Sequence, residues 1–425
     1  MTHPQHPSDP AIAPAAMPRA QFVRWRTAVF AIFALSGLSV ATWASRVPAI
    51  KAELGLDTLG VGLLLLSAGI ASIIGLSLAP VVAARLGART GMRIAMLVFA
   101  LGVALVGIGA EAVQSPAVVA VGLAFFGLGN GSVDVMMNVE GAAIEQRQGG
   151  TLLPMFHAFF SLGTVIGASL GALAASLQIG VLPHALAIAV VIVVASFVTS
   201  AAVPRVDASD PTRSADAGAP RRSIRERLDI ALSAWREPRT YALGVIMLGM
   251  SFAEGGANDW LALGVTQGHG HGDALGAIGL AVFSASMTIA RLAGGPLIDR
   301  FGRLATLRVL AVTAVIGMLM FILAPNVPLI LIGAFLWGAG VSMGFPLGMS
   351  AAADDPARAA ARVSACATIG YVAFLAGPPL LGFLAEHLGL LNTLFIVAGL
   401  VAASGLFSGA ARPMKPAQPV PAAQG

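Results

Sequence analysis

Charged residues are scarce in this chain. They make up 11% of its 425 residues, against about 25% in ordinary soluble domains. Apolar residues make up 57% of the chain, and the mean hydropathy is +0.85. A protein with so few charges cannot keep its whole surface in water. The composition therefore excludes an ordinary soluble globular protein and favours one that is embedded in a membrane.

Several other features of known protein classes are missing. The single cysteine, Cys366, has no second thiol with which to form an internal disulfide. Residues 1–20 contain no apolar stretch, so we expect no cleavable signal peptide. No glycine-rich run is followed by the Lys-Ser or Lys-Thr pair of an ATP-binding loop, and no motif places a metal site or a catalytic triad. We therefore expect no enzyme activity, no metal, no cofactor and no direct use of ATP.

Long apolar runs are present instead. A membrane-spanning helix needs about 20 apolar residues, and the sequence contains twelve runs of roughly this length. They lie at 27–46, 59–82, 91–111, 117–143, 152–176, 182–203, 240–262, 273–297, 306–325, 327–351, 362–386 and 390–411. Six runs precede a polar segment at 204–239 and six follow it. We therefore expect an all-α membrane protein with twelve transmembrane helices.

The positive charges predict its orientation. When the N-terminus is placed inside, 22 of the 25 Lys and Arg residues fall on the inner side, eight of them in 204–239. Because such residues are retained on the cytoplasmic side, both termini are expected in the cytoplasm. The calculated pI of 10.3 then reflects topology, and we expect no nucleic-acid partner. Residues 221–238 alternate charged and apolar side chains, which is typical of an amphipathic helix lying on membrane lipids.

Three pairs of matching segments predict an internal repeat. APVVAARLGAR (79–89) matches GGPLIDRFGR (294–303) at an offset of 215, and GLGNG (127–131) matches GAGVS (338–342) at 211. Trp43 and Trp260 each end a predicted helix, 217 residues apart. Repeats at similar offsets predict two pseudo-symmetric six-helix bundles. We place them at 27–203 and 240–411, joined by 204–239 and flanked by tails at 1–26 and 412–425.

The string GGPLIDRFGR resembles the cytoplasmic-loop motif of the major facilitator superfamily. More narrowly, the chain resembles the YbjJ group of bacterial inner-membrane proteins, related to the fucose-permease branch, in the strings WASRVPAI (43–50), VEGAAIE (139–145), LPMFHAFFSLGT (153–164), FAEGGANDW (252–260) and GFPLGMSAA (344–352). The resemblance implies the major facilitator fold and alternating access to a central cavity. It also implies a gate at the loop motif, carried by Asp299, Arg300 and Arg303. Ala84 replaces the aspartate in the first copy, so this gate is expected to be one-sided.

Three polar residues in the fourth helix are candidates for solute binding and proton coupling. Asn130, Asp134 and Asn138 recur every four residues and share one face. A carboxylate at bilayer depth costs at least about 2.5 kcal/mol, so such a face usually lines a cavity. The resemblance adds that Asp134 and Asn138 match an acidic-x-x-x-Asn pattern of fucose-permease-like symporters, in which the acidic residue takes up a proton. Alternatively, Asp134 hydrogen-bonds to a neighbouring helix.

Glu140 and His157 lie on either side of the turn at 146–151, at similar depth. We expect them in one layer, either as a proton relay or inner gate or as a static pair near the surface. In the seventh helix, Glu254 and Asn258 share a face and are expected to line the cavity. Asp259 is expected near the outer end, as a gate or as a cap of the following loop.

Two further residues are candidate solute ligands. Arg291 in the eighth helix either binds an anionic group or extends toward the inner loop. Trp337 in the tenth helix offers an aromatic face to a sugar-like solute.

Three functions are compatible with these residues. The first is proton-coupled import of a small polar solute, and the second is drug or metabolite export by proton antiport. Exporters of this superfamily often carry a Gly-Pro pair in the fifth helix. Here Ala168 follows Gly167, and the pair is Gly377-Pro378 in the eleventh helix, which favours import. The third is a membrane receptor or scaffold. A receptor of this kind is expected to carry an appended soluble domain, and the segment 204–239 is too short to form one. The expected partners are a small-molecule substrate, a coupling ion (a proton, with sodium as the alternative) and membrane lipids, and the chain is expected to be a monomer.

Overall fold

The structure is a computed structural model that describes residues 17–148, 152–204, 233–355 and 358–413. Within these residues every regular element is a helix. The elements are α1 (Arg19–Ala44), α2 (Val47–Glu53), α3 (Thr58–Gly107), η1 (Ile108–Ala112), α4 (Pro116–Gln148), α5 (Leu153–Ser176), α6 (Val181–Ala202), α8 (Pro238–Leu263), η3 (Gly264–Gly268), α9 (Asp273–Leu323), α10 (Val327–Val341), α11 (Gly344–Ala352), α12 (Ala359–Leu388), α13 (Leu390–Phe407) and η4 (Ser408–Ala411).

These helices supply twelve membrane crossings. In the described chain, eight helical stretches are long and apolar enough to cross a membrane. Two of them, α3 and α9, contain 50 and 51 residues. Measured along the helix path at 1.5 Å per residue, each is about 75 Å long, which is more than twice the thickness of the hydrocarbon core. Each therefore crosses the membrane twice. The more polar helices α8 and α12 complete the twelve crossings that the apolar runs predict.

The kinks of α3 and α9 occur at equivalent glycines. Gly87 has φ 75° and ψ 155°, and Gly302 has φ 78° and ψ 159°. Only glycine adopts this region readily, because a Cβ atom would clash with the backbone. Each glycine therefore ends one crossing and begins the next within its copy of the loop motif. The matching angles confirm the repeat that the offset of 215 predicts.

Small residues bring the helices of each half into close contact. A Cβ atom added at Gly127 or Gly131 of α4 would lie 2.1 or 2.3 Å from the carbonyl oxygens of Ala68 and Ser72 on α3. At Gly163 of α5 it would lie 2.0 Å from that of Ala34 on α1. These distances confirm that the GxxxG spacings permit backbone-to-backbone packing. Any larger side chain at these positions would separate the helices.

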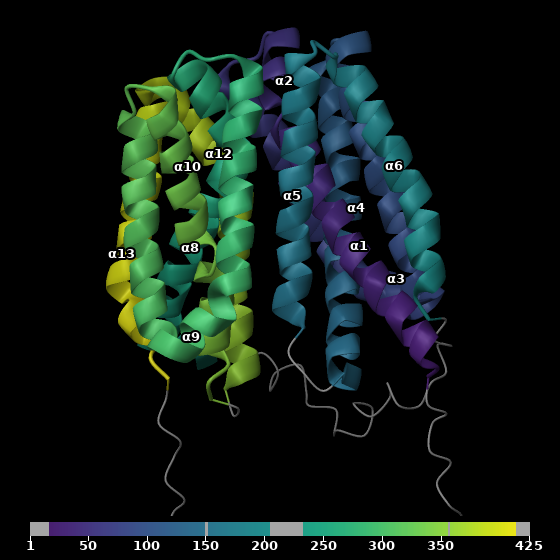
Figure 1. Ribbon diagram of the computed structural model, residues 1–425, viewed down its shortest axis with the longest axis vertical. Helices are drawn as coiled ribbons and strands as arrows, with labels where there is room; N and C mark the ends of the chain where they lie inside the picture. The colour runs from purple at the N-terminus through teal and green to yellow at the C-terminus, as the bar shows by residue number, and fades with distance from the viewer. Residues whose placement is uncertain (1–16, 149–151, 205–232, 356–357, 414–425) are drawn as a thin grey trace, which may run out of the picture.

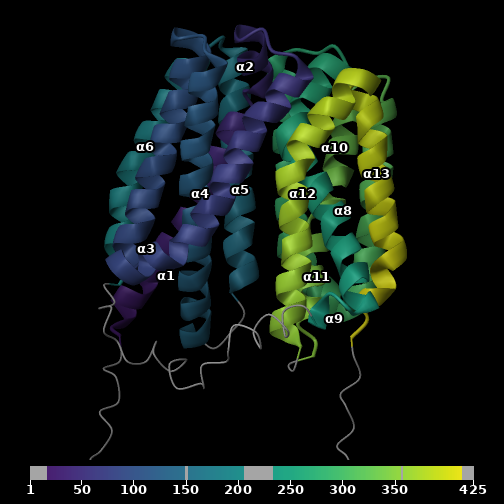
Figure 2. The ribbon, with the colours of Figure 1, turned by 180° about the vertical axis from the view of Figure 1, so that it is seen from behind.

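The two halves stand side by side, with α1 to α6 in one bundle and α8 to α13 in the other (Figures 1 and 2). Both described termini lie at the same end, which we call the inner end, following the predicted orientation. At the outer end, one buried apolar cluster includes Trp43 and Leu64 of the first half and Trp260 and Leu381 of the second.

Polar and backbone contacts also join the halves at the outer end. Lys51 Nζ donates to Gln267 Oε1 at 2.6 Å. The backbone N–H of Thr58 donates to Glu386 at 3.1 Å. A Cβ atom added at Gly62 would lie 2.9 Å from the Pro378 carbonyl oxygen. The structure is therefore a state in which the outer end is closed.

Two sequence expectations differ from the structure or fall outside it. The first helix begins at Arg19 rather than near residue 27. Its extra turns are stabilised because Trp25, only 3% exposed, packs into the core of the first half. Most of the predicted amphipathic helix at 221–238 lies outside the described residues. Its described end packs Ala234 against Ala361 and Ala365 of α12.

The kink at Gly302 provides a test of the fold. No atom lies within 4 Å of a Cβ added there, so the penalty for Gly302→Ala is conformational and about 1–3 kcal/mol. We expect a lower thermal unfolding midpoint for the purified protein. Gly295→Ala is the matched control, because Gly295 is equally open but helical, and it should be neutral or stabilising. Equal midpoints for the two variants would contradict the kink.

Candidate functional site

Arg291 lies where the two halves meet and connects three helices. From α9, its Nη2 donates to Glu254 Oε1 on α8 at 2.9 Å. Its Nη1 donates to Ser161 Oγ on α5, in the other half, at 2.6 Å. Its Nε donates to the backbone carbonyl of Ser342 at 3.0 Å. Arg291 therefore does not extend toward the inner loop, which was one of its two predicted roles.

The Arg291–Glu254 pair is largely removed from solvent. The side chain of Arg291 is 11% exposed and that of Glu254 is 14% exposed. Removing one partner of a buried ion pair typically costs about 3–5 kcal/mol, because the other charge is left without compensation. The pair therefore lies directly beside a contact between the halves, because Arg291 also reaches Ser161.

Glu140 and His157 have separate partners. Glu140, 2% exposed, accepts a hydrogen bond from Trp25 Nε1 at 2.9 Å. The His157 ring packs edge-on against Phe33, with centroids 5.3 Å apart, and lies within electrostatic reach of Arg291. His157 therefore belongs to the surroundings of Arg291, whereas Glu140 joins α4 to α1. Trp25 could not be predicted as the partner of Glu140, since an aromatic residue near a helix start gives no signal of a carboxylate partner.

The polar residues on one face of α4 have two kinds of surroundings. Ser36 Oγ of α1 donates to Asn130 Oδ1 at 2.6 Å, so Asn130 takes part in the contact between two helices. Asn138 Nδ2 donates to the Asp134 carbonyl at 2.8 Å and to its carboxylate at 3.3 Å. Asp134 is half-buried. Among the described residues, its carboxylate has a hydrogen bond only within its own helix.

Two predicted positions need reinterpretation. Asp259 lies inside α8, which continues to Leu263 and then into the π-helical η3, so Asp259 is not a cap of the outer loop. Trp337 is fully buried. Its ring packs edge-on against Phe283 and Phe321, with centroids 5.8 and 5.7 Å apart. Trp337 therefore lies in the core of the second half and does not offer its face to a solute in this state. Asn258, which was predicted to line the cavity, is half-buried on α8.

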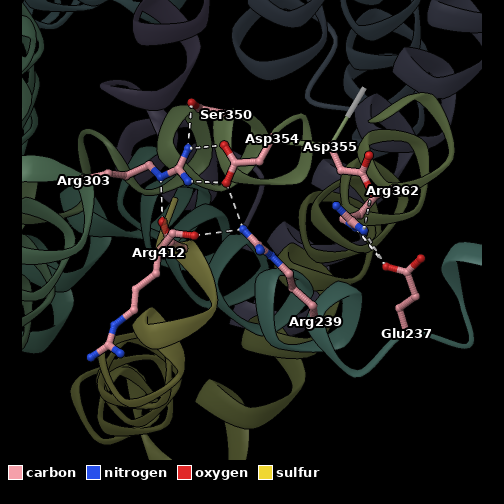
Figure 3. A network of polar contacts seen from close by, with 9 residues as sticks. Glu237, Arg239, Arg303, Ser350, Asp354, Asp355, Arg362 and Arg412 are labelled. Atoms are coloured by element: carbon pink, nitrogen blue, oxygen red, sulfur yellow. Dashed lines mark hydrogen bonds and ion pairs between the residues drawn. The ribbon is translucent and has the colours of Figure 1, made fainter. Parts of the chain in front are cut away.

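A network of ion pairs lies at the inner end of the second half (Figure 3). Arg303 forms a bidentate pair with Asp354, and its Nη1 lies 2.9 Å from Oδ1. Arg239 Nη2 donates to Asp354 Oδ2 at 2.9 Å and to the carbonyl of Arg412 at 3.0 Å. The network joins the kinked middle of α9 and the loop after α11 to the start of α8 and to the C-terminal end. Asp354 was missed because a loop carboxylate carries no motif.

The three predicted gate residues do not act together in this state. Arg303 is held by Asp354, with a side chain only 9% exposed. Asp299 and Arg300 are exposed, and the Arg300 guanidinium lies 5.4 Å from the centroid of the Phe301 ring. A second cluster holds Glu237 between Arg358 and Arg362 at 2.8 and 2.7 Å. Its Arg362–Glu237 pair is drawn in Figure 3.

Opposing effects set the pKa of Asp354. Burial acts to raise it, but the hydrogen bonds and charges of Arg303 and Arg239 outweigh burial and hold the pKa below its ordinary value. A carboxyl group with a lowered pKa in the folded state stabilises the fold above its unfolded pKa of about 3.9. This contribution is lost as the pH falls through the lower pKa of the folded state.

Asp354→Asn tests this network. We expect it to lower the free energy of unfolding at pH 7 by about 2 kcal/mol, between the values for exposed and buried ion pairs. The difference between wild type and variant should shrink below about pH 4. Thermal unfolding at several pH values measures both effects. Asp299→Asn, at an exposed position, should be neutral, and a pH-independent difference would contradict the assignment.

The chain is similar to known transporters over nearly its whole length. Its sequence matches the family described as Major Facilitator Superfamily over residues 28–369 and again over 272–424. It is 31% identical to an uncharacterized transporter of this family type from Yersinia pestis, over 87% of this chain and 90% of the relative.

Two solved structures have the same fold. A variant of the nucleoside transporter NupG has a TM-score of 0.72 and 14% identity, covering 92% of this chain and 99% of the other. A variant of the E. coli fucose:proton symporter FucP has a TM-score of 0.61 and 17% identity, covering 93% of this chain and 100% of the other. The chain is a multi-pass membrane transporter, not an enzyme, and it belongs to the major facilitator superfamily.

Proposed function

We propose that this protein imports a small polar solute across the bacterial inner membrane by proton-coupled alternating access, with both termini in the cytoplasm. The observation that carries the proposal is the position of Arg291. It pairs with Glu254 in its own half and donates a hydrogen bond to Ser161 in the other half. A change in the charge of Glu254 therefore acts directly on a contact between the halves.

The chemistry follows from the guanidinium group. When Glu254 is ionised, it holds Arg291 in place. When Glu254 takes up a proton, its attraction for Arg291 falls, and the planar guanidinium N–H groups become available to oxygen atoms of a solute. The amides of Asn138 and Asn258 offer further donors and acceptors. Asp134 is the second candidate proton carrier, because its carboxylate has no cationic partner among the described residues.

The proposed solute is a neutral, hydroxyl-rich molecule such as a sugar or a nucleoside. The structural relatives NupG and FucP are a nucleoside transporter and a fucose:proton symporter, and nucleosides and fucose are both small and rich in hydroxyl groups. Arginine, asparagine and serine side chains suit such groups, since each forms directional hydrogen bonds. The proposed partners are this solute, the proton and the surrounding lipids, and the transporter is proposed to act as a monomer.

Export of drugs or metabolites by proton antiport is the second candidate. The Gly-Pro pair lies in α12 instead of α5, where Gly167 packs on the backbone of Leu38. This placement favours import.

Proteoliposomes loaded with a pH-sensitive dye test the proposal. A panel of sugars, polyols, nucleosides, amino acids and lipophilic cations is added to wild type, Glu254→Gln, Asp134→Asn and the exposed control Glu53→Gln. We expect a polar solute to move protons in wild type and in the control. Glu254→Gln should abolish proton-coupled uptake while leaving solute exchange intact, because the glutamine amide cannot take up and release a proton.

The other outcomes distinguish the alternatives. If Asp134→Asn alone uncouples transport, Asp134 is the coupling residue and the Arg291–Glu254 pair is structural. A response to lipophilic cations only would favour the exporter. Normal coupling in both variants would contradict the proposed site.

A further inference from the structure

A second carboxylate in α8 faces a cavity that the Arg291 site does not use. Asp259, together with Ser251 and Gly255, lines a small cavity between α8 and α12, where Gly377 and Pro378 form the opposite wall. Ser251, Gly255 and Asp259 are spaced by four residues and therefore share one face of α8. Glu254 and Asn258 lie on the neighbouring face. Among the described residues, Asp259 makes no hydrogen bond and no ion pair.

The hydroxyl group of Ser251 is the second unusual feature of this cavity. Buried serines in helices normally donate to a carbonyl one turn earlier, as Ser39, Ser196 and Ser342 do here. Ser251 is 1% exposed, but its Oγ has no hydrogen-bond partner among the residues that the structure describes. A buried hydroxyl left without a partner costs about 1–3 kcal/mol. It therefore points to an occupant of the cavity.

The wall formed by α12 offers backbone oxygens. Pro378 and Pro379 lie inside this helix, and proline has no N–H to donate to the carbonyl four residues earlier. The backbone carbonyls of Phe374 and Leu375 therefore lack their usual helical partners. Because positions four residues apart share a face, the first of these carbonyls lies on the same side of α12 as Pro378.

A carboxylate, a hydroxyl and freed backbone carbonyls are all hard oxygen donors, the ligand type that alkali and alkaline-earth cations prefer. In other transporters, backbone carbonyls of interrupted helices coordinate sodium at membrane depth. One carboxylate balances one positive charge. A divalent ion would leave a net charge inside the bilayer, which is costly.

We propose that Asp259 and Ser251, with the backbone carbonyls at the proline break of α12, form a sodium-binding site. The inference goes beyond the proposed function, because it adds an ion site separate from the Arg291–Glu254 pair. Binding can be measured without any transported solute, so the two proposals can fail independently.

The site lies behind the closed outer end. The Pro378 carbonyl faces Gly62 of α3 in the other half, and a Cβ atom added at Gly382 would lie 2.9 Å from the Thr58 carbonyl oxygen. An ion that holds α12 against α8 therefore acts on the helix that closes against α3. Sodium binding then changes the equilibrium constant of outer closure, and outer closure changes the affinity for sodium by the same factor.

Thermal unfolding of the purified full-length protein tests the site, in NaCl, KCl or choline chloride at one ionic strength. We expect a midpoint that rises with the logarithm of the sodium concentration in wild type and does not rise in potassium or choline. Asp259→Asn should lose the sodium-dependent shift, and the exposed control Glu53→Gln should retain it. Ser251→Ala, a smaller change that should preserve folding, is expected to bind radioactive sodium several-fold more weakly.

Equal midpoints in all three salts would overturn the proposal, as would a sodium shift that persists in Asp259→Asn. Stabilisation of wild type by acid alone, with no difference between sodium and choline, would identify a proton site and would also overturn it. Unchanged sodium binding in Ser251→Ala would remove the hydroxyl from the site and contradict the proposed geometry.

Discussion

The structure depends on one constraint, which is that a charge at bilayer depth needs a partner within the protein. Arg291 and Glu254 satisfy it for each other at 2.9 Å. Because the remaining donors of Arg291 reach Ser161 and the Ser342 carbonyl, the same guanidinium also joins the halves. A charge that must be paired, placed at the boundary between two bundles, is the basis of the proposed link between protonation, solute binding and the relative position of the bundles.

Each bundle is held together by close internal contacts. Within each half, glycines such as Gly127 and Gly163 let helix backbones pack directly on one another. The ion pairs around Asp354 and Glu237 hold the inner end of the second half together. Contacts between the halves are concentrated at the outer end, where Lys51 and Thr58 reach across. Rigid halves joined at one end are suited to a rocking motion, as expected of alternating access.

The sequence predicted the fold well because its determinants are local. Apolar run length, glycine spacing and the loop repeat gave the crossings, the close helix contacts and the equivalence of Gly87 and Gly302. The partners of the polar residues were harder to predict. Pairing of Arg291 with Glu254, or of Arg303 with Asp354, depends on which helices become neighbours, and one sequence does not specify this. Asp259 lies near the outer end of α8, as its depth predicted, but one sequence did not show that it lines a cavity against α12.

The central claim is that the closed outer end described here is one of two states of a rocking transporter. Pulsed electron spin resonance on lipid-embedded protein measures this directly, with one spin-label pair at Leu86→Cys and Phe301→Cys on the inner end and another at Glu53→Cys and Leu388→Cys on the outer end. All four positions are exposed. The account predicts that a pH change or a transported solute shifts the two distances in opposite directions. Distances that stay fixed under all conditions, or that lengthen and shorten together, would contradict it.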